Sequence, residues 1–310
     1  MPKWTAADIP DQTGRTILIT GANSGLGLRS AEALARAGAL VIMACRNEAK
    51  AKTACDGVAT AARGAPPAIV SLDLADLGSV RDAAAEVRER FGRVDVLMNN
   101  AGLMIPPLQR TAEGHELQFA TNHLGHFALT GLLLPALAGP GARVVTTSSM
   151  AHRPGTIRWD DIDWNKRYSK WLAYSQSKLA NLLFAFELNR RATVAGTKLA
   201  SVAAHPGYAA THLQTAAGEA AGHRLKTMIM QLGNRVFAQS DAMGALPQLY
   251  AATMPDVDGG QYFGPDLFEW RGHPRLVGAA RKAYDVETAT RLWSLSEELT
   301  GVQYDFTAIA

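Results

Sequence analysis

The stretch Thr16–Leu28, with the sequence TILITGANSGLGL, constrains the fold of this 310-residue chain more than any other segment. Residues 16–20 are mostly apolar or β-branched, which predicts a short strand buried on both faces. Gly21, Gly25 and Gly27 follow, and apolar residues then recur at helical spacing. A strand that turns through glycines into a helix presents first-turn N–H groups to an anion such as a pyrophosphate. The same pattern also closes ordinary strand–helix connections, and its GxxxGxG spacing differs from the more familiar GxGxxG.

The rest of the chain repeats this order of strand and helix. Short apolar runs predict strands at residues 40–45, 68–72, 94–98, 142–147 and 198–203. Apolar spacing predicts helices at residues 47–62, 79–91, 111–137 (broken near the middle), 174–195 and 286–299. Such alternation forms a parallel sheet covered by helices on both faces. We therefore expect an α/β protein with a doubly wound sheet of about seven strands, the last after Gly260, in one Rossmann-fold domain over residues 1–310.

Two regions depart from the alternation. Residues around 208–240 contain the small-residue run TAAGEAAG and the Met-rich run LKTMIMQL. A lid-like segment over an apolar substrate and a plain surface helix both fit this composition. Residues 265–310 are expected to form a C-terminal extension.

Composition excludes several classes of protein. With 47% hydrophobic residues and a net charge of +3, the chain can bury a large core and carries no excess charge for a polyanion. It lacks a Lys/Arg cluster with interleaved aromatics, so we expect no nucleic-acid partner. Cys45 and Cys55 are the only cysteines and have no partners at metal spacing, which predicts no metal site and suits a reducing, cytoplasmic compartment. The longest apolar run, near residues 124–137, is too short to cross a bilayer, and the N-terminus does not match a signal peptide.

Tyr174 and Lys178 are four residues apart in YSQSK and share one face of a predicted helix. A phenol has an ordinary pKa near 10, whereas a general acid/base works best when it titrates near the operating pH. A fixed ammonium beside Tyr174 would favour the phenolate and lower that pKa. The alternative is a surface pair in which the lysine stem lies along the helix.

The chain resembles the short-chain dehydrogenase/reductase family along nearly its whole length. The motifs occur in the family's order: TGANSGLG (20–27), DL (73–74), NNAG (99–102), NHLGHF (122–127), SS (148–149), YSQSK (174–178) and HPG (205–207). Each motif is weak alone, but the ordered set is highly specific.

The resemblance implies a role for each matching residue. Tyr174 would exchange the proton with the substrate oxygen, Lys178 would bind the nicotinamide ribose, and Ser149 would hydrogen-bond the substrate oxygen. Asn122 would hold a water that connects Lys178 to solvent. The residues implied in cofactor binding, besides Tyr174 and Lys178, are Gly21, Asn23, Ser24, Gly25, Leu26, Gly27, Asp73, Leu74, Asn99, Ala101, Gly102, Pro206, Gly207, Tyr208 and Thr211.

The charge near the end of the second strand bears on the choice of cofactor. NAD-binding sheets of this kind place a carboxylate on the ribose hydroxyls about 20 residues after the glycine turn. This chain has Cys45-Arg46 there. A guanidinium is a good partner for a 2′-phosphate, so we expect NADP to be preferred over NAD. The alternatives are that NAD is the cofactor, or that Arg46 is simply solvated and binds no ligand.

The spacing between Ser149 and Tyr174, 25 positions, is longer than in most of the family. The extra stretch, together with MACRN, TNHLGHF and YSQSKLAN, resembles retinol-dehydrogenase-like and protochlorophyllide-reductase-like members. This resemblance implies a bulky, apolar carbonyl or alcohol as substrate, and since neither cysteine lies where the light-driven reductases need one, we favour the retinol-dehydrogenase-like branch. Trp159, Trp164 and Trp171 could line such a pocket or could simply pack in the core.

These observations predict an NAD(P)-dependent oxidoreductase that interconverts an alcohol and a carbonyl on an apolar small molecule. Reduction of an activated C=C bond and a non-catalytic NADP-sensing protein remain as alternatives. The resemblance further implies a possible homodimer or homotetramer formed through the helix that contains Tyr174.

Overall fold

A computed structural model describes residues 3–137, 139–208 and 239–309. Its centre is one eight-stranded sheet in the order β3-β2-β1-β4-β5-β6-β7-β8. The strands are β1 (Thr16–Thr20), β2 (Leu40–Cys45), β3 (Ala68–Ser71), β4 (Val96–Asn99), β5 (Arg143–Thr147), β6 (Ala200–Ala204), β7 (Tyr262–Leu267) and β8 (Arg271–Leu276). All neighbours pair in parallel except β7 and β8. The predicted doubly wound α/β fold is confirmed, with an antiparallel eighth strand that the sequence pattern did not reveal.

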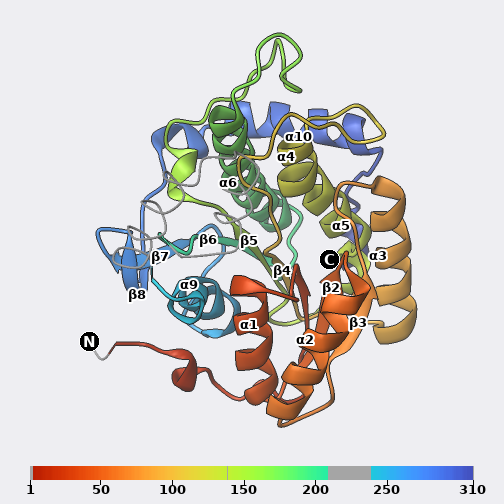
Figure 1. Ribbon diagram of the computed structural model, residues 1–310, viewed down its shortest axis with the longest axis vertical. Helices are drawn as coiled ribbons and strands as arrows, with labels where there is room; N and C mark the ends of the chain where they lie inside the picture. The colour runs from red at the N-terminus through yellow and green to blue at the C-terminus, as the bar shows by residue number, and fades with distance from the viewer. Residues whose placement is uncertain (1–2, 138, 209–238, 310) are drawn as a thin grey trace, which may run out of the picture.

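Helices cover both faces of the sheet (Figure 1). On one face lie α1 (Gly25–Arg36), α2 (Glu48–Ala61) and α9 (Asp241–Thr253), which pack on Ile17, Ile19, Val41 and their neighbours. On the other lie α3 (Leu77–Phe91), α5 (Gly125–Leu132) and α6 (Lys170–Val194), which pack on Leu18, Ile42 and Leu97. Successive residues of the strands thus enter opposite cores, which explains why each strand is apolar throughout.

The helix predicted over residues 111–137 is shorter and broken. Residues 103–116 form no helix, and the helical part consists of α4 (Leu117–Phe119), a π turn at Ala120–Leu124 and α5. The predicted break therefore lies at the π turn, which holds Asn122. Polar contacts between residues 103–116 and more distant residues replace helical bonds there.

The helix predicted to begin at Tyr174 begins one turn earlier, at Lys170, because Ser169 caps it. Helix α10 (Val286–Thr300) packs along α6 on the outer side, with Trp293 stacked on Phe184 at 5.9 Å between ring centroids. Part of α6, the helix through which the resemblance implied pairing, is therefore contacted by α10 of the same chain, and the oligomeric state stays a prediction.

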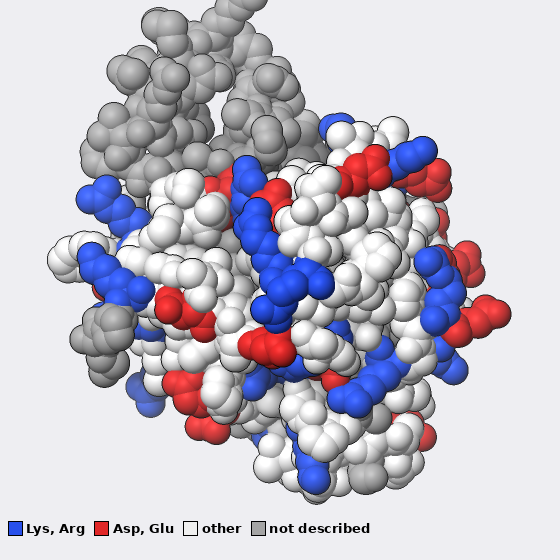
Figure 2. Space-filling model, turned by 90° about the horizontal axis from the view of Figure 1, so that it is seen from below, with Lys and Arg blue, Asp and Glu red and all other residues white. Residues whose placement is uncertain are grey.

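The lid-like segment expected around residues 208–240 lies almost wholly outside the described residues. The expected C-terminal extension contributes the end of β7, all of β8 and α10. Within the described ranges, no helix combines the length and apolarity needed to cross a membrane. Seen from below relative to Figure 1, the surface carries a short stripe of basic side chains with acidic side chains beside it (Figure 2).

Candidate active site

The glycine turn joins β1 to α1 as predicted. Gly21 and Gly25 have φ angles of 67° and 52°, in the left-handed region that favours glycine. A Cβ built on Gly27 would overlap the carbonyl oxygen of Gly21 and approach Asn100 Nδ2 at 2.6 Å. A Cβ on Gly25, in contrast, would meet no described atom within 4 Å because it would project into open space. Gly27 is therefore required for packing, and Gly25 leaves room for a ligand.

A cleft of about 1060 Å³ opens in front of this turn. The predicted cofactor residues that line it are Gly21, Asn23, Ser24, Gly25, Leu26, Gly27, Arg46, Asp73, Leu74, Ala101 and Gly102. The ends of β1, β2 and β4 thus converge on one elongated space, as expected at the carboxyl edge of a parallel sheet. At the N-terminus of α1, the Ser24 side chain makes no capping hydrogen bond, so first-turn N–H groups are available to phosphate oxygens. These residues fit a dinucleotide.

Other lining residues were not predicted: Ala44, Cys45, Asn47, Lys50, Leu72, Asn100, Leu103 and Thr121. Most adjoin a predicted residue in sequence, so the signal was their position at a strand end. Lys50 is different, because only the turn from β2 into α2 brings it to the cleft. Burial raises the pKa of Cys45 to about 11, so its thiol stays protonated at neutral pH.

The side chains of Asn99 and Asn100 point to different places, which the sequence did not reveal. The Asn99 side chain is fully buried and donates to Thr130 Oγ1 at 3.0 Å, away from the lining of the cleft. Asn100 lines the cleft, and its Nδ2 donates to the carbonyl of Thr20 at 2.8 Å. The structure thus brings Asn100 to the cleft wall, and the predicted backbone contact of Asn99 with a cofactor stays a prediction.

Arg46 lies at one end of the cleft with Lys50 and Asp73. Its Nη1 is 3.7 Å from Asp73 Oδ2, and its side chain is 68% exposed, so the ion pair is open to solvent. Asn47 caps α2 by accepting from Lys50 N at 2.9 Å. Two cations therefore border the cleft at the place where a ribose phosphate was predicted.

Tyr174 and Ser149 lie next to each other at the carboxyl edge of the sheet. Ser149 follows β5 by two residues, Tyr174 is in the second turn of α6, and the Ser149 hydroxyl is close enough to the phenol to influence its pKa. Burial raises the pKa of Tyr174 to about 12, and the nearby Ser149 hydroxyl opposes this rise. The predicted lowering of this pKa by Lys178 is therefore not found in the protein alone, because burial dominates.

Lys178 is itself buried, which lowers its pKa to about 8. Its Nζ donates to the carbonyl of Thr147 at 3.1 Å and lies 5.8 Å from the centroid of the Tyr174 ring. A Cβ on Gly102 would stand 3.4 Å from this Nζ, so the lysine lies directly behind the cleft wall. The ammonium is thus close to both the cleft wall and the tyrosine ring.

Asn122 is buried in the π turn and holds the chain that follows β4. Its Oδ1 accepts from Leu103 N at 2.7 Å, and its Nδ2 lies 3.0 Å from the carbonyl oxygen of Leu103 and 2.9 Å from Ser177 Oγ. The side chain therefore fixes the segment beside Gly102. The predicted water next to Lys178 stays a prediction.

Pro206, Gly207 and Tyr208 lie against the β7–β8 turn. Gly207 has a φ of 66°, and a Cβ there would overlap the carbonyl oxygen of Trp270. Tyr208 N donates to the same carbonyl at 2.7 Å. These three residues do not appear in the lining of the cleft, and Thr211 lies outside the described residues, so their contact with a cofactor stays a prediction.

The three tryptophans proposed for a pocket wall differ. Trp159 lies under the Arg291 guanidinium, and Trp164 is 3% exposed beneath Arg158. Trp171 is 47% exposed, and its ring centroid is 6.1 Å from that of Tyr174. Only Trp171 is in ring contact with Tyr174, and the other two are explained by packing.

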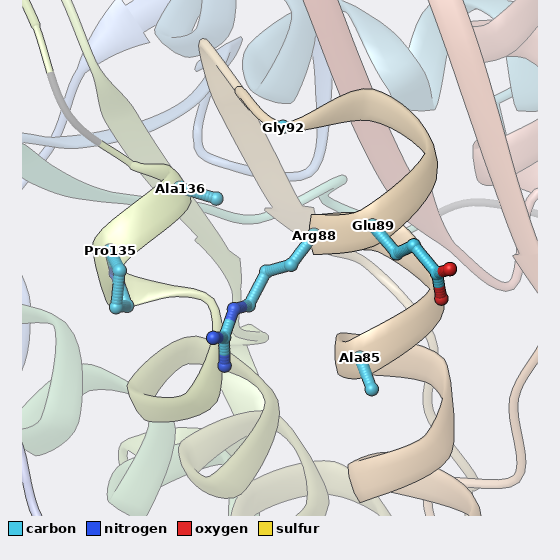
Figure 3. Close-up of a pocket in the computed structure, with 6 residues that line it drawn as sticks. All are labelled: Ala85, Arg88, Glu89, Gly92, Pro135 and Ala136. Atoms are coloured by element: carbon cyan, nitrogen blue, oxygen red, sulfur yellow. The ribbon is translucent and has the colours of Figure 1, made fainter.

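A smaller cavity of about 390 Å³ lies between α3 and the 3-10 turn Leu134–Ala136 (Figure 3). Arg88 extends from α3 toward the side where Pro135 lies, whereas Glu89 points away. The cavity is lined by Ala85, Arg88, Glu89, Gly92, Pro135 and Ala136 and shares none of them with the cleft. In the part of the chain that the structure describes, no cluster of three or more His, Cys, Asp and Glu is placed to hold a metal.

Comparison with known proteins agrees with this geometry. A family model described as short chain dehydrogenase matches residues 15–222. Retinol dehydrogenase 14 of Mus musculus is 40% identical over 307 residues, which cover 93% of this chain and 86% of that protein. Retinol dehydrogenase 13 of Homo sapiens is 38% identical over 298 residues, 94% of this chain and 86% of that protein.

Among solved structures, that of an uncharacterised protein from Mycobacterium paratuberculosis is similar with 47% identity and a TM-score of 0.81, over 98% of this chain and 99% of that one. The predicted likeness to the retinol-dehydrogenase branch is confirmed. The chain belongs to the short-chain dehydrogenase family and is an oxidoreductase that acts on CH–OH groups with a nicotinamide cofactor.

Proposed function

We propose that this enzyme interconverts an alcohol and a carbonyl on a bulky apolar substrate, with Tyr174 as the general acid/base. The observation that supports this most is that Tyr174 and Ser149 lie close together beside a buried lysine, at the carboxyl edge of the sheet. Lys178 adjoins Gly102 in the cleft wall, so the pair lies next to the space suited to the dinucleotide.

In the direction of reduction, the bound nicotinamide supplies the hydride and the chain supplies orientation and the proton. The Tyr174 hydroxyl donates its proton to the carbonyl oxygen. A pKa of about 12 keeps the phenol protonated at neutral pH, which suits an acid. Ser149 Oγ accepts from Ala151 N at 3.2 Å, and this bond orients the hydroxyl so that its own proton can be donated to the substrate oxygen.

Lys178 has its role after the proton has left. A phenolate in a buried site needs a compensating charge, and the ammonium lies 5.8 Å from the ring. With a pKa of about 8, it is still mostly charged at pH 7. In the direction of oxidation, the same charge favours the phenolate that accepts the alcohol proton.

We further propose NADP as the preferred cofactor. Arg46 and Lys50 both border the cleft, and a 2′-phosphate placed between them would gain two charged contacts. Asp73 is already opposite Arg46, so binding of the phosphate would exchange a weak, solvent-exposed ion pair for a stronger one.

The apolar nature of the substrate is supported by two observations. Trp171 and Leu172, in the first turn of α6, are 47% and 44% exposed near Tyr174. The similar proteins named retinol dehydrogenase act, by their names, on an apolar alcohol. A cytoplasmic location stays a prediction.

The test is a panel of hydrophobic ketones, aldehydes, alcohols and enones, each assayed with NADPH and NADH on wild type and Tyr174→Phe. We expect carbonyl reduction by wild type and a loss of at least ~10²-fold in kcat for the variant, because acid catalysis is lost. Tyr250→Phe serves as the matched control, since Tyr250 bonds to Asp256 at the surface. Products saturated at the C=C bond would contradict the carbonyl assignment, and full activity of Tyr174→Phe would contradict the mechanism.

A further inference from the structure

His152 forms a bridge behind the catalytic serine. It is fully buried in the 3-10 turn Met150–His152, which Ser149 caps. Its Nδ1 lies 2.6 Å from the carbonyl oxygen of Ser149, and its backbone N–H donates to the same oxygen at 3.0 Å. Its Nε2 lies 3.0 Å from the backbone nitrogen of Ala280, which is 128 positions further along the chain. One ring thus connects the serine to a segment beyond β8.

The two partners of the ring determine its tautomer. A backbone N–H can only donate, so Nε2 must be the unprotonated nitrogen that accepts from Ala280. A carbonyl oxygen can only accept, so Nδ1 must carry the hydrogen that is donated to Ser149. Only the neutral ring with its proton on Nδ1 satisfies both contacts. Burial also lowers the pKa of His152 to about 4, in agreement with a neutral ring at pH 7.

We propose that His152 is a positioning residue for the reaction: its ring fixes the carbonyl of Ser149, and thereby the hydroxyl of Ser149 beside Tyr174, using Ala280 as the anchor. This inference rests on the proposed roles of Ser149 and Tyr174. Ser149 Oγ accepts from Ala151 N within the same turn, so the orientation of the whole turn determines where the hydroxyl lies beside Tyr174. A shift of the turn by a fraction of an ångström would misplace the donor relative to the substrate oxygen.

The anchor is itself well fixed. Ala279 N donates to the Tyr284 hydroxyl at 3.0 Å, so the segment before Ala280 is held from its own side. Arg153, next to His152, contacts both carboxylate oxygens of Glu269 at 2.9 Å through Nη2. The turn that carries Ser149 is therefore tied to the C-terminal region at two points, by a neutral bond and by an ion pair.

Two substitutions separate the two bonds of the ring. The amide nitrogen of Asn in His152→Asn can take the place of Nδ1 and keep the donor to Ser149, whereas Gln in His152→Gln reaches the place of Nε2 and keeps the acceptor for Ala280. We expect His152→Gln to lower kcat for carbonyl reduction about 10-fold or more, with the KM and the Kd for NADPH nearly unchanged. His152→Asn, which breaks only the bond to the anchor, is expected to lower kcat to a similar extent as the removal of the Ala280 donor.

The decisive measurement repeats each variant in a Ser149→Ala background. If His152 acts through Ser149, His152→Gln lowers kcat no further there. Ala280→Pro gives an independent check at the anchor, since the substitution removes the N–H that donates to Nε2 and puts the proline Cδ against the ring, which displaces it. Its kcat should fall in wild type and not in Ser149→Ala, even if a His152 variant fails to fold.

Losses that multiply with that of Ser149→Ala, or an undiminished kcat in both His152→Gln and Ala280→Pro, would overturn the positioning role. Ser149→Ala with undiminished kcat would instead contradict the proposed function, so the two failures can be told apart. The thermal unfolding midpoint of every variant is measured alongside the kinetics. If His152 were purely structural, its variants would lower this midpoint, and their loss of kcat would be the same with or without Ser149.

Discussion

The two sides of Tyr174 are built by different means. On the cofactor side, the wall consists largely of backbone and small side chains at strand ends, with Gly21, Gly25, Ala101 and Gly102 among them. On the opposite side, residues 103–118 and 150–171 form no long element and are held by contacts between polar side chains. The shape of the cofactor wall is determined by small residues that let the backbone approach the cleft closely. The shape of the opposite wall is determined by which side chains bond to one another.

The opposite wall shows its dependence at Ile105, a β-branched residue with a φ of 59°. Such a conformation is costly and persists only where surrounding contacts enforce it. Gln118 Oε1 accepts from Ile105 N at 2.8 Å, and the Tyr168 hydroxyl donates to the carbonyl of Pro106 at 3.1 Å. Glu116, whose pKa is raised by burial, lies 3.3 Å from the same hydroxyl. A local motif therefore identifies the cofactor wall, whereas the opposite wall depends on contacts between residues 13 to 62 positions apart.

Among these variants, Lys178→Met should have the largest effect on activity. It tests the residue that lies beside both Tyr174 and the cofactor wall. Activity is expected to fall at least ~10²-fold. At pH 7 the free energy of unfolding should rise by up to about 3 kcal/mol, because burial depresses the pKa of Lys178 from 10.5 to about 8 and the folded state bears the cost of its charge. The carbonyl of Thr147 keeps Asn181 as a donor.

The pH dependence of the free energy of unfolding tests this effect of Lys178 on stability. Between pH 8 and about 10.5 the folded lysine has lost its proton while the unfolded one keeps it, so wild-type stability gains on the variant as pH rises through this window. Urea unfolding at pH 7 and pH 10 measures the difference. A variant less stable than wild type at pH 7 would show that the lysine supports the fold rather than the ligand.

Gly27→Ala and Gly25→Ala should separate packing from binding within the cofactor wall. A Cβ at position 27 overlaps the carbonyl of Gly21, so we expect a loss of about 2–3 kcal/mol in stability. A Cβ at position 25 meets nothing within 4 Å and costs about 1 kcal/mol through its φ of 52°, yet it enters the space left for the phosphates. Unfolding and fluorescence titration with NADPH measure both. Wild-type affinity in Gly25→Ala would contradict the phosphate site.

Arg46→Ala should weaken NADPH binding about 10-fold or more and leave NADH binding unchanged, because only NADPH carries the 2′-phosphate. Lys50→Ala should act in the same direction and more weakly. Lys52→Ala, on the same helix and exposed away from the lining residues, is the control. Equal use of both cofactors by wild type, together with a harmless Arg46→Ala, would refute the preference.

Tyr168→Phe should give the smallest effect and probe the opposite wall. Loss of the bond to the Pro106 carbonyl is expected to cost about 1 kcal/mol in stability and to raise the KM for a bulky carbonyl more than that for NADPH. The exposed bond of Tyr250 makes Tyr250→Phe the control, with a smaller change. A change confined to the KM for NADPH would mean that the two walls are not separate in function.

The part of the site that was predictable follows from the same division. The glycine turn, the strand ends and the neighbourhood of Tyr174, Lys178 and Ser149 could be read because strand–helix alternation places them together without any knowledge of side-chain contacts. The sequence did not predict that Asn100 lines the cleft, because this depends on the direction of one side chain.

The rest depended on pairings between distant residues. The antiparallel β8 follows a turn whose two central residues, Phe268 and Glu269, have positive φ although neither is glycine. Such a turn lacks the usual Gly or Asn signal. Trp159 and Trp164 pack against Arg291 and Arg158, contacts that their own sequence surroundings do not announce. The rise in the pKa of Tyr174 also depends on its burial, which a motif does not give.

The packing of α10 on α6 has a consequence for the order in which the enzyme can mature. Every motif residue up to His205 is synthesised before Trp293 leaves the ribosome, yet Trp293 stacks on Phe184, and Ser296 meets His123 at 2.8 Å. A nascent chain whose last segment is still in the ribosome thus already contains all of the proposed catalytic groups. At that stage α10 does not yet cover α6, the helix that bears Tyr174 and Lys178. Translation must finish before that helix is fully supported.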